Sequence, residues 1–254
     1  MKKIIVLLCL AIMMSTSIVS INANIDPDSI VGIWLLDEGQ GGNIKDSSGN
    51  GNDGKINGAE WTDGKIGKAL DFDGSAKVEI PPSESIDDVF DGFTYLLWIK
   101  PTAAPPNVNT RVMERDWHNP TIQIGPTDFY ASIAVNADQA QTNVRGGAWE
   151  MNEWSFVAIT HDGNTLMLYV DGEFVADKDV GKPDDKDNSD IRLASWRDPG
   201  WTFTGVLDEV AVFNTPLADK DLTHIMDNGL EEALSVSSEG KLTTTWGNLK
   251  KIRQ

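Results

Sequence analysis

Short apolar runs, each ended by a cluster of turn-forming residues, recur along most of the chain. The clearest example covers residues 154–175, where Asp162-Gly163 and Asp171-Gly172 separate alternating apolar runs. Asp-Gly favours tight hairpin turns, because both central residues of a type I′ turn need a positive φ. The pattern therefore predicts three antiparallel strands that follow one another as a meander.

Other segments share this β-rich composition. The strongest covers residues 93–100, which are apolar on both faces in the middle, as expected of a central strand between packed layers. Further strands are predicted over residues 30–36, 55–57, 69–72, 77–80, 110–115, 121–124, 129–135, 191–195 and 202–213.

One helix is predicted late in the chain. It begins near Pro216, carries Leu222, Ile225 and Met226 at helical spacing, and ends at Gly229. Regular short strands with one short helix near the C-terminus predict an all-β fold, in which two antiparallel sheets pack as a sandwich.

The first 23 residues have the pattern of a secretory signal peptide. Lys2 and Lys3 precede an apolar run over residues 4–14, and Ile21-Asn22-Ala23 is a candidate cleavage site. The run is short for a membrane span, although a membrane anchor is the alternative. We therefore expect a signal peptide at 1–23, one domain at 24–234 and a tail at 235–254. The protein would be secreted or held in the cell envelope, with no later membrane span.

Charge and cysteine content exclude several functions. The formal net charge is −18, and without Lys2 and Lys3 it becomes −20, from 19 basic and 39 acidic residues. Such an acidic chain repels nucleic acid. Cys9 is the only cysteine and lies in the signal sequence, so the exported chain would contain no disulfide. Its core must hold the fold, and a structural cation could add to it.

Seven motifs follow one another in a characteristic order. They are GIWLLDE at 32–38, DSSGNGNDG at 46–54, GKALDFDG at 67–74, FTYLLWIKP at 93–101, NEWSFVAIT at 152–160, LYVDG at 168–172 and GVLDEVAVF at 205–213. In this order they resemble the laminin-G-like, concanavalin A-like jelly-roll domains of exported bacterial proteins. The resemblance implies a jelly roll of two curved antiparallel sheets. It also implies binding of carbohydrates, glycosaminoglycans or proteins, or a purely structural role.

The resemblance further implies a structural calcium ion. Asp208 interrupts an apolar strand, and a buried carboxylate needs a partner or a cation. In related domains the matching aspartate binds calcium together with backbone carbonyls near the first strand, which would place Glu38 and Asp73 nearby. The alternative is that Asp208 accepts hydrogen bonds from backbone N–H groups, while the other two residues only shape turns.

Loop tryptophans beside polar residues predict a ligand-binding surface. Trp117, Trp196 and Trp201 lie in loop contexts, with Arg115 and Arg197 close to them in the sequence. Exposed aromatic rings stack on the apolar faces of sugars, while polar neighbours bond the hydroxyl groups. The alternative is that these rings cover the open edges of the sandwich. The leading hypothesis is a non-enzymatic module that binds carbohydrate or glycan.

Catalytic motifs are weak by comparison. Glycosidases of this fold resemble one another in paired carboxylates on one strand, spaced Glu-x-Asp-x-Glu or with one more residue before the last, which flank the scissile bond. Here Glu114-Arg115-Asp116 comes nearest, but His118 and Asn119 occupy the possible positions of the third carboxylate. We expect no enzyme. A protein-interaction or structural domain of the cell envelope is the second hypothesis, and a glycoside hydrolase or lyase is the third.

Overall fold

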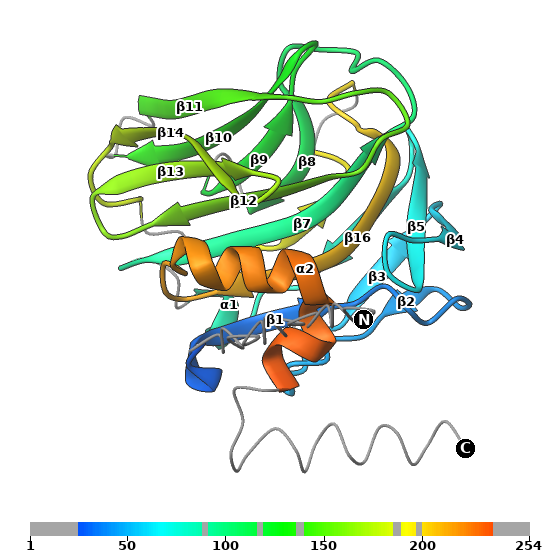
Figure 1. The fold of residues 1–254 in the computed structure, drawn as a ribbon. Helices are drawn as coiled ribbons and strands as arrows, with labels where there is room; N and C mark the ends of the chain where they lie inside the picture. Colours follow the sequence, from blue (N-terminus) through cyan, green and yellow to red (C-terminus); the bar gives the residue numbers. More distant parts are fainter. Residues whose placement is uncertain are drawn as a thin grey trace, which may run out of the picture.

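The computed structural model describes residues 25–87, 91–115, 119–135, 140–184, 189–196 and 200–235. Two antiparallel sheets pack face to face, and a helix near the C-terminus lies outside them (Figure 1). The predicted all-β sandwich with one late helix is therefore confirmed. The predicted signal peptide and nearly all of the predicted tail lie outside the described residues.

The first sheet has the strand order β14-β13-β12-β7-β16-β5-β4, and β1 also pairs with β16. Its strands are β1 (Ile30–Trp34), β4 (Glu60–Asp63), β5 (Lys68–Asp73), β7 (Phe93–Pro101), β12 (Ser155–His161), β13 (Thr165–Val170), β14 (Glu173–Asp179) and β16 (Thr204–Phe213). The predicted central strand is β7, and all but one of its residues are buried.

The second sheet has the strand order β11-β10-β9-β8-β15-β6-β3-β2. Its strands are β2 (Asn43–Ile44), β3 (Gly54–Asn57), β6 (Lys77–Ile80), β8 (Thr110–Arg115), β9 (Thr121–Ile124), β10 (Asp128–Val135), β11 (Ala140–Ala148) and β15 (Ile191–Leu193). The helical segments of the described chain are η1 (Pro27–Ser29), α1 (Glu84–Asp87) and α2 (Asp219–Ser235).

The predicted meander is confirmed as β12, β13 and β14, which pair in sequence order. Asp171 and Gly172 have φ values of 52° and 78°, as both central positions of a type I′ turn require. The first connection is longer, because β12 ends at His161 and β13 begins at Thr165. Only one of the two expected turns is thus a two-residue turn.

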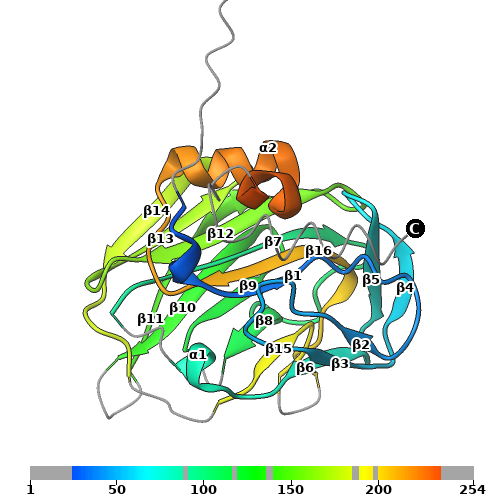
Figure 2. The same cartoon turned by 90° about the horizontal axis from the view of Figure 1, so that it is seen from below.

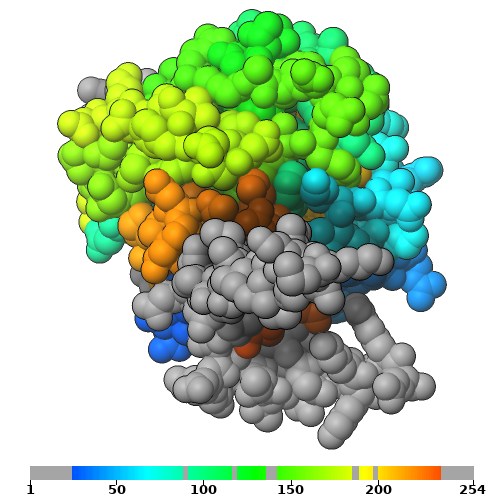
Figure 3. Space-filling view, viewed as in Figure 1, coloured from blue at the N-terminus to red at the C-terminus, as the bar shows by residue number. Residues whose placement is uncertain are grey.

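Helix α2 covers the outer face of the first sheet. Its buried residues Leu222, Ile225 and Leu230 pack against Leu96 and Phe156 of β7 and β12. Figure 2 shows the resulting layers, with α2 above the first sheet and the second sheet below. In Figure 3 the orange side chains of α2 lie close against the yellow-green strands β13 and β14. The helix therefore covers the outer face of the first sheet. On the second sheet, polar residues gather on the outer face.

The boundaries of α2 differ from those predicted. The helix begins at Asp219 instead of near Pro216, and Gly229 interrupts it with φ 77° and ψ 162°. Beyond Gly229 the chain becomes helical again, because the Glu209 carboxylate accepts a hydrogen bond from the Leu230 N–H at 2.5 Å. The predicted stop at Gly229 is right for the first helical segment and wrong for the whole element.

Candidate functional site

The outer face of the second sheet carries polar side chains in rows that cross the strands. Cross-strand pairing places Arg111, Gln123, Tyr130 and Arg145 in one row, and Glu114, Thr121, Ser132 and Asn143 in the next. Residues between these positions, such as Ile122, Ala131 and Val144, point into the core. Because side chains alternate between the two faces of a strand, one buried apolar set fixes the polar set on the opposite face.

Arg111 lies at the centre of the polar contacts on this face. Its Nε lies 3.1 Å from Oε2 of Glu114, and its Nη1 donates to the Asn109 carbonyl at 3.0 Å and to Oε1 of Gln123. The side chains of Arg111 and Glu114 are only 5% and 2% exposed. Burial, the largest cause, lowers the pKa of Arg111, and Glu114 opposes this effect. A guanidinium nevertheless stays protonated in proteins, so this is a buried ion pair.

Trp196 and Trp201 lie together beside Arg111. Their ring centroids are 6.4 Å apart with the planes at 90°, and both residues are partly exposed. The Arg111 guanidinium lies 5.7 Å from the Trp196 ring and 5.6 Å from the Trp201 ring. These distances fall within the reach of about 6 Å for a cation–π contact. One buried cation thus contacts both rings.

Backbone contacts fix the segments that carry the two rings. The Arg111 N–H donates to the Trp201 carbonyl at 2.9 Å, and the Ala194 N–H donates to the Val112 carbonyl at 2.8 Å. Ala194 has a φ of 64°, in the left-handed region that side chains other than glycine rarely adopt. Such strain tends to occur where a structure positions functional groups. Here it redirects the chain after β15 toward Trp196.

The other predicted ligand-binding residues fall elsewhere. Arg115 is completely buried, and its Nη2 lies 2.6 Å from Oδ1 of Asp87 in α1. We therefore correct its assignment: Arg115, the last residue of β8, holds α1 through this ion pair, and its side chain presents no surface to a ligand. Trp117 and Arg197 lie outside the described residues. Arg111, which the sequence did not single out, takes the central position.

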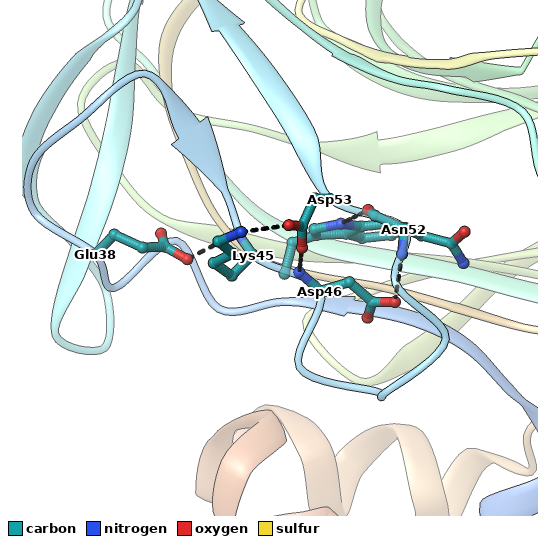
Figure 4. Close-up of polar contacts among 6 residues, drawn as sticks. Glu38, Lys45, Asp46, Asn52 and Asp53 are labelled. Carbon is teal, nitrogen blue, oxygen red and sulfur yellow. Dashed lines mark hydrogen bonds and ion pairs between the residues drawn. The ribbon is translucent and has the colours of Figure 1, made fainter. Parts of the chain in front are cut away.

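The predicted calcium ligands do not come together as a set. Oδ2 of Asp208 accepts hydrogen bonds from the N–H groups of Lys65 and Ile66 at 2.8 and 3.0 Å. Oε1 of Glu38 accepts from the Lys45 N–H at 2.8 Å within the loop drawn in Figure 4. Asp73 accepts instead from backbone N–H groups of the turn that follows it.

Among the residues that the structure describes, no group of three or more His, Cys, Asp or Glu is placed to hold a metal ion. Asp208, Glu38 and Asp73 therefore do not fit a calcium ion as a three-carboxylate site. The contacts of Asp208 are those that the alternative to a calcium site predicts, since its carboxylate accepts hydrogen bonds from backbone N–H groups. A calcium ion held by Asp208 with backbone carbonyls stays a prediction.

The loop in Figure 4 has a clear structural role. Asp46 accepts hydrogen bonds from the N–H groups of Ile33, Ser48 and Asn52 at 2.9 to 3.0 Å, of which Figure 4 draws the bond from Asn52. The Asn52 side-chain amide donates to the Val31 carbonyl. These bonds occupy polar groups along the free edge of β1. Covering a strand edge in this way prevents it from pairing with another chain.

Two adjacent carboxylates are buried at a bulge in β16. Burial raises the pKa of Asp208 to about 7, and the Asp37 carboxylate adds to the effect. Burial also raises the pKa of Glu209 to about 8, with further contributions from Asp208, Asp37 and Glu231. The pairing of β16 with β7 is irregular between Asp208 and Ala211, and both acids are buried outside the core between the sheets, with Asp208 against the backbone of Lys65 and Glu209 against α2.

The fold and the sequence together define the family. The model of the concanavalin A-like lectin/glucanases superfamily matches residues 72–223, so the chain belongs to this superfamily. The matching model is of the laminin-G type, in agreement with the resemblance drawn from the motifs. A comparison with curated proteins gives no match. None of the described helices is long and apolar enough to cross a membrane.

Several solved structures share the fold. Domain 4 of AbnA, a GH43 extracellular arabinanase from Geobacillus stearothermophilus solved in complex with arabinotriose, is 20% identical with a TM-score of 0.63. The match covers 78% of this chain and 98% of that domain. The binding domain of Paraclostridial Mosquitocidal Protein 1 is 16% identical with a TM-score of 0.64, over 79% of this chain and 52% of that one.

The binding domain of botulinum neurotoxin DC has also been solved, in complex with SialylT, and gives 16% identity and a TM-score of 0.63. That match covers 79% of this chain and 52% of the toxin domain. The present chain thus spans about half the length of these toxin binding domains. At such low identities the likeness shows the fold alone.

Proposed function

We propose that this chain is a non-catalytic carbohydrate-binding module that acts outside the cell or in the cell envelope. The observation that carries the proposal is the Trp196–Trp201 pair, which is partly exposed and contacts Arg111 beside the polar face of the second sheet. Superfamily membership and the arabinotriose complex of a domain with the same fold support it.

The exposed parts of the two rings suit a sugar. The indole Nε1 of Trp196 is buried without a hydrogen-bond partner among the described residues, so the exposed part of this ring is carbon. Carbon surfaces of tryptophan stack on the C–H face of a sugar ring, whereas hydroxyl groups at the ring edge need polar partners. The exposed Asn143 and Arg145 on β11 lie on the same face of the sheet.

The proposal of a non-catalytic role also has a structural argument. Glu114, the first carboxylate of the weak glycosidase-like motif, is buried against Arg111, and Asp116 lies outside the described residues. Glycoside hydrolysis needs a carboxyl group that reaches the glycosidic oxygen of the substrate. A carboxylate that is 2% exposed and paired with a guanidinium is poorly placed for this task.

Export is part of the proposal. We assign residues 1–23 to a signal peptide, and a chain without further cysteines suits a domain that needs no disulfides after export. The size of the apolar core is in keeping with this requirement. Mass spectrometry of the protein purified from its host would test the assignment, because cleavage after Ala23 leaves a new N-terminus at Asn24.

A second candidate function is binding to another protein. The botulinum neurotoxin DC binding domain has also been solved in complex with rat synaptotagmin II, so a domain with this fold can take a protein ligand. The partly exposed tryptophans would suit either kind of partner. Capture of envelope proteins by the wild-type chain, unaffected by free oligosaccharides, would favour this second function.

Binding to insoluble and soluble polysaccharides tests the proposed function. Wild-type protein should bind at least one polysaccharide in co-sedimentation or affinity electrophoresis, and Trp196→Ala and Trp201→Ala should each weaken binding about tenfold or more. A tenfold loss corresponds to about 1.4 kcal/mol, which lies within the range of about 1–3 kcal/mol for stacking of a nucleic-acid base on an aromatic side chain. Trp154→Ala is the matched control, because Trp154 packs under Lys100 at 4.9 Å on the other sheet. No binding by a folded wild-type chain would contradict the proposal.

A further inference from the structure

The arginines of the second sheet are all neutralised by acidic side chains. Of the arginines that the structure describes, Arg111, Arg115, Arg145 and Arg192, every one lies in this sheet and forms an ion pair. Three of the four contacts are 2.9 Å or shorter, and the fourth is the 3.1 Å contact of Arg111 with Glu114. The pattern holds at the centre of the sheet and at its edge.

Arg111 is the arginine that contacts the tryptophans, and its Nε and Nη1 groups already face acceptors of the protein. Nε faces Glu114, while Nη1 donates to the Asn109 carbonyl and to Gln123. The Trp196 and Trp201 rings lie against the guanidinium. A carboxylate on a ligand would have to displace a buried Glu114 to bond this group, at the full cost of breaking a buried ion pair.

The neighbouring arginines are neutralised in the same way. Arg192 on β15, the strand that leads to Trp196, has its Nε 2.7 Å from Oδ2 of Asp190 and 3.9 Å from Oε1 of Glu79. Arg145 on β11 is held by both oxygens of Asp128 and lies 4.1 Å from the centroid of the Tyr130 ring. These guanidinium groups are fixed in place and bonded to carboxylates.

The whole-chain charge acts in the same direction. With 39 acidic and 21 basic residues, the protein repels anions before they reach the surface. The exposed parts of the Trp196 and Trp201 rings remain available for stacking, which needs no charge on the sugar.

We infer that the surface beside Trp196 and Trp201 takes neutral sugars and rejects glycans that carry uronic or sialic acid. This inference rests on the proposed function and adds the ligand class. Ring stacking supplies affinity, and each described arginine already forms an ion pair with a carboxylate of the protein. Selectivity for neutral sugars thus follows from the carboxylates that neutralise each described arginine.

An oligosaccharide array of matched composition tests the inference. It carries neutral arabino-, xylo-, gluco- and galacto-oligosaccharides beside galacturono-, glucurono- and sialyl-oligosaccharides. Wild-type protein should bind only neutral members, with less than a twofold change in affinity between about 0.05 and about 0.5 M NaCl, because salt screens charge contacts but not stacking. Preferential binding of acidic members, or a tenfold loss of affinity in high salt, would overturn the inference.

One pair of variants tests the part that the carboxylates play. Asp190→Asn removes the nearest partner of Arg192 and should raise binding to acidic members about tenfold, because the guanidinium can then form a charge-assisted hydrogen bond with a carboxylate of the ligand. Asp128→Asn is the matched control, because it makes the same change beside Arg145 on β11, which two strands separate from β8, the strand of Arg111. It should give a smaller gain.

The outcomes separate the two claims. Equal gains from both variants, or a gain from neither in folded protein, would overturn the part assigned to Arg192. If no oligosaccharide of either kind binds to folded wild-type protein, the proposed function fails and the inference falls with it. If the wild-type protein binds acidic oligosaccharides and the Trp201→Ala variant does not, the proposed function is preserved but the inferred selectivity for neutral sugars is refuted.

Discussion

Removing the Arg111 side chain tests whether one buried cation supports the tryptophan surface. Arg111→Ala leaves the Glu114 carboxylate, 2% exposed, without the guanidinium that lies 3.1 Å away. Breaking a buried ion pair by removing one partner costs about 3–5 kcal/mol, and each lost cation–π contact adds about 0.5–1 kcal/mol. Because these terms overlap, we expect the free energy of unfolding to fall by roughly 4 kcal/mol.

Urea unfolding followed by tryptophan fluorescence at pH 7 measures this loss. The double variant Arg111→Met with Glu114→Leu removes both charges and should recover most of the stability, because apolar groups of similar size often replace a buried ion pair at little cost. Arg145→Ala is the matched control. Its ion pair with Asp128 is half exposed, so the expected change is small.

Two results would refute this reasoning. One is an Arg111→Ala protein within about 1 kcal/mol of wild type, which would mean that the ion pair is not effectively buried. The other is a double variant as unstable as the single one, which would assign the loss to packing around the tryptophans and not to an uncompensated carboxylate.

Further predictions concern pH and metal ions. The pKa values of Asp208 and Glu209, raised by burial to about 7 and about 8, mean that the folded chain holds more protons than the unfolded chain above about pH 4. Stability from these acids is therefore present at low pH and lost as the pH rises to about 8, and Asp208→Asn should flatten this decline in the urea midpoint. Burial lowers the pKa of His161 below its ordinary value of 6.5, so its contribution is present above that pH and lost as the pH falls. His161→Gln should thus differ most from wild type at pH 7.5 and least at pH 5. Chelator should lower the melting temperature if calcium binds the folded chain, whereas an unchanged melting curve would remove the calcium prediction.

The regular alternation of apolar residues made most of the sheet structure predictable. Strands β6, β8 and β9 begin and end at the predicted residues, because buried apolar positions and turn residues bound them closely. Strand β11 was missed. It contributes Val144 to the core but otherwise carries polar residues and two glycines, as suits an edge strand of a sheet.

The candidate site was predictable only in part. Trp196 and Trp201 are predicted as binding residues from their loop contexts, whereas Arg111 lies within the predicted strand over residues 110–115 and is not singled out by the sequence. A usable signal is present in the neighbouring strands: polar residues alternate with apolar ones in β9 and in the first half of β10, which indicates one polar face. Their burial depends on what packs over them, and short-range patterns do not contain that information.

Long-range partners explain the remaining differences. Asp208 receives hydrogen bonds from residues 142 and 143 positions away in the chain, and Arg115 pairs with Asp87 in a helical turn 28 positions away. A single sequence shows that such groups need partners, because a buried charge without one is costly. It does not distinguish a cation from a backbone N–H group as the partner of Asp208.

The most direct measurement is a titration of indole N–H signals by nuclear magnetic resonance. Spectra of ¹⁵N-labelled protein would be recorded with a neutral oligosaccharide bound on the array, and signals would be assigned with single Trp→Phe variants. We predict that the signals of Trp196 and Trp201 move in proportion to binding while those of the buried Trp34 and Trp98 stay in place. Saturable binding that leaves Trp196 and Trp201 unmoved, or that moves Trp154 instead, would contradict the location of the site.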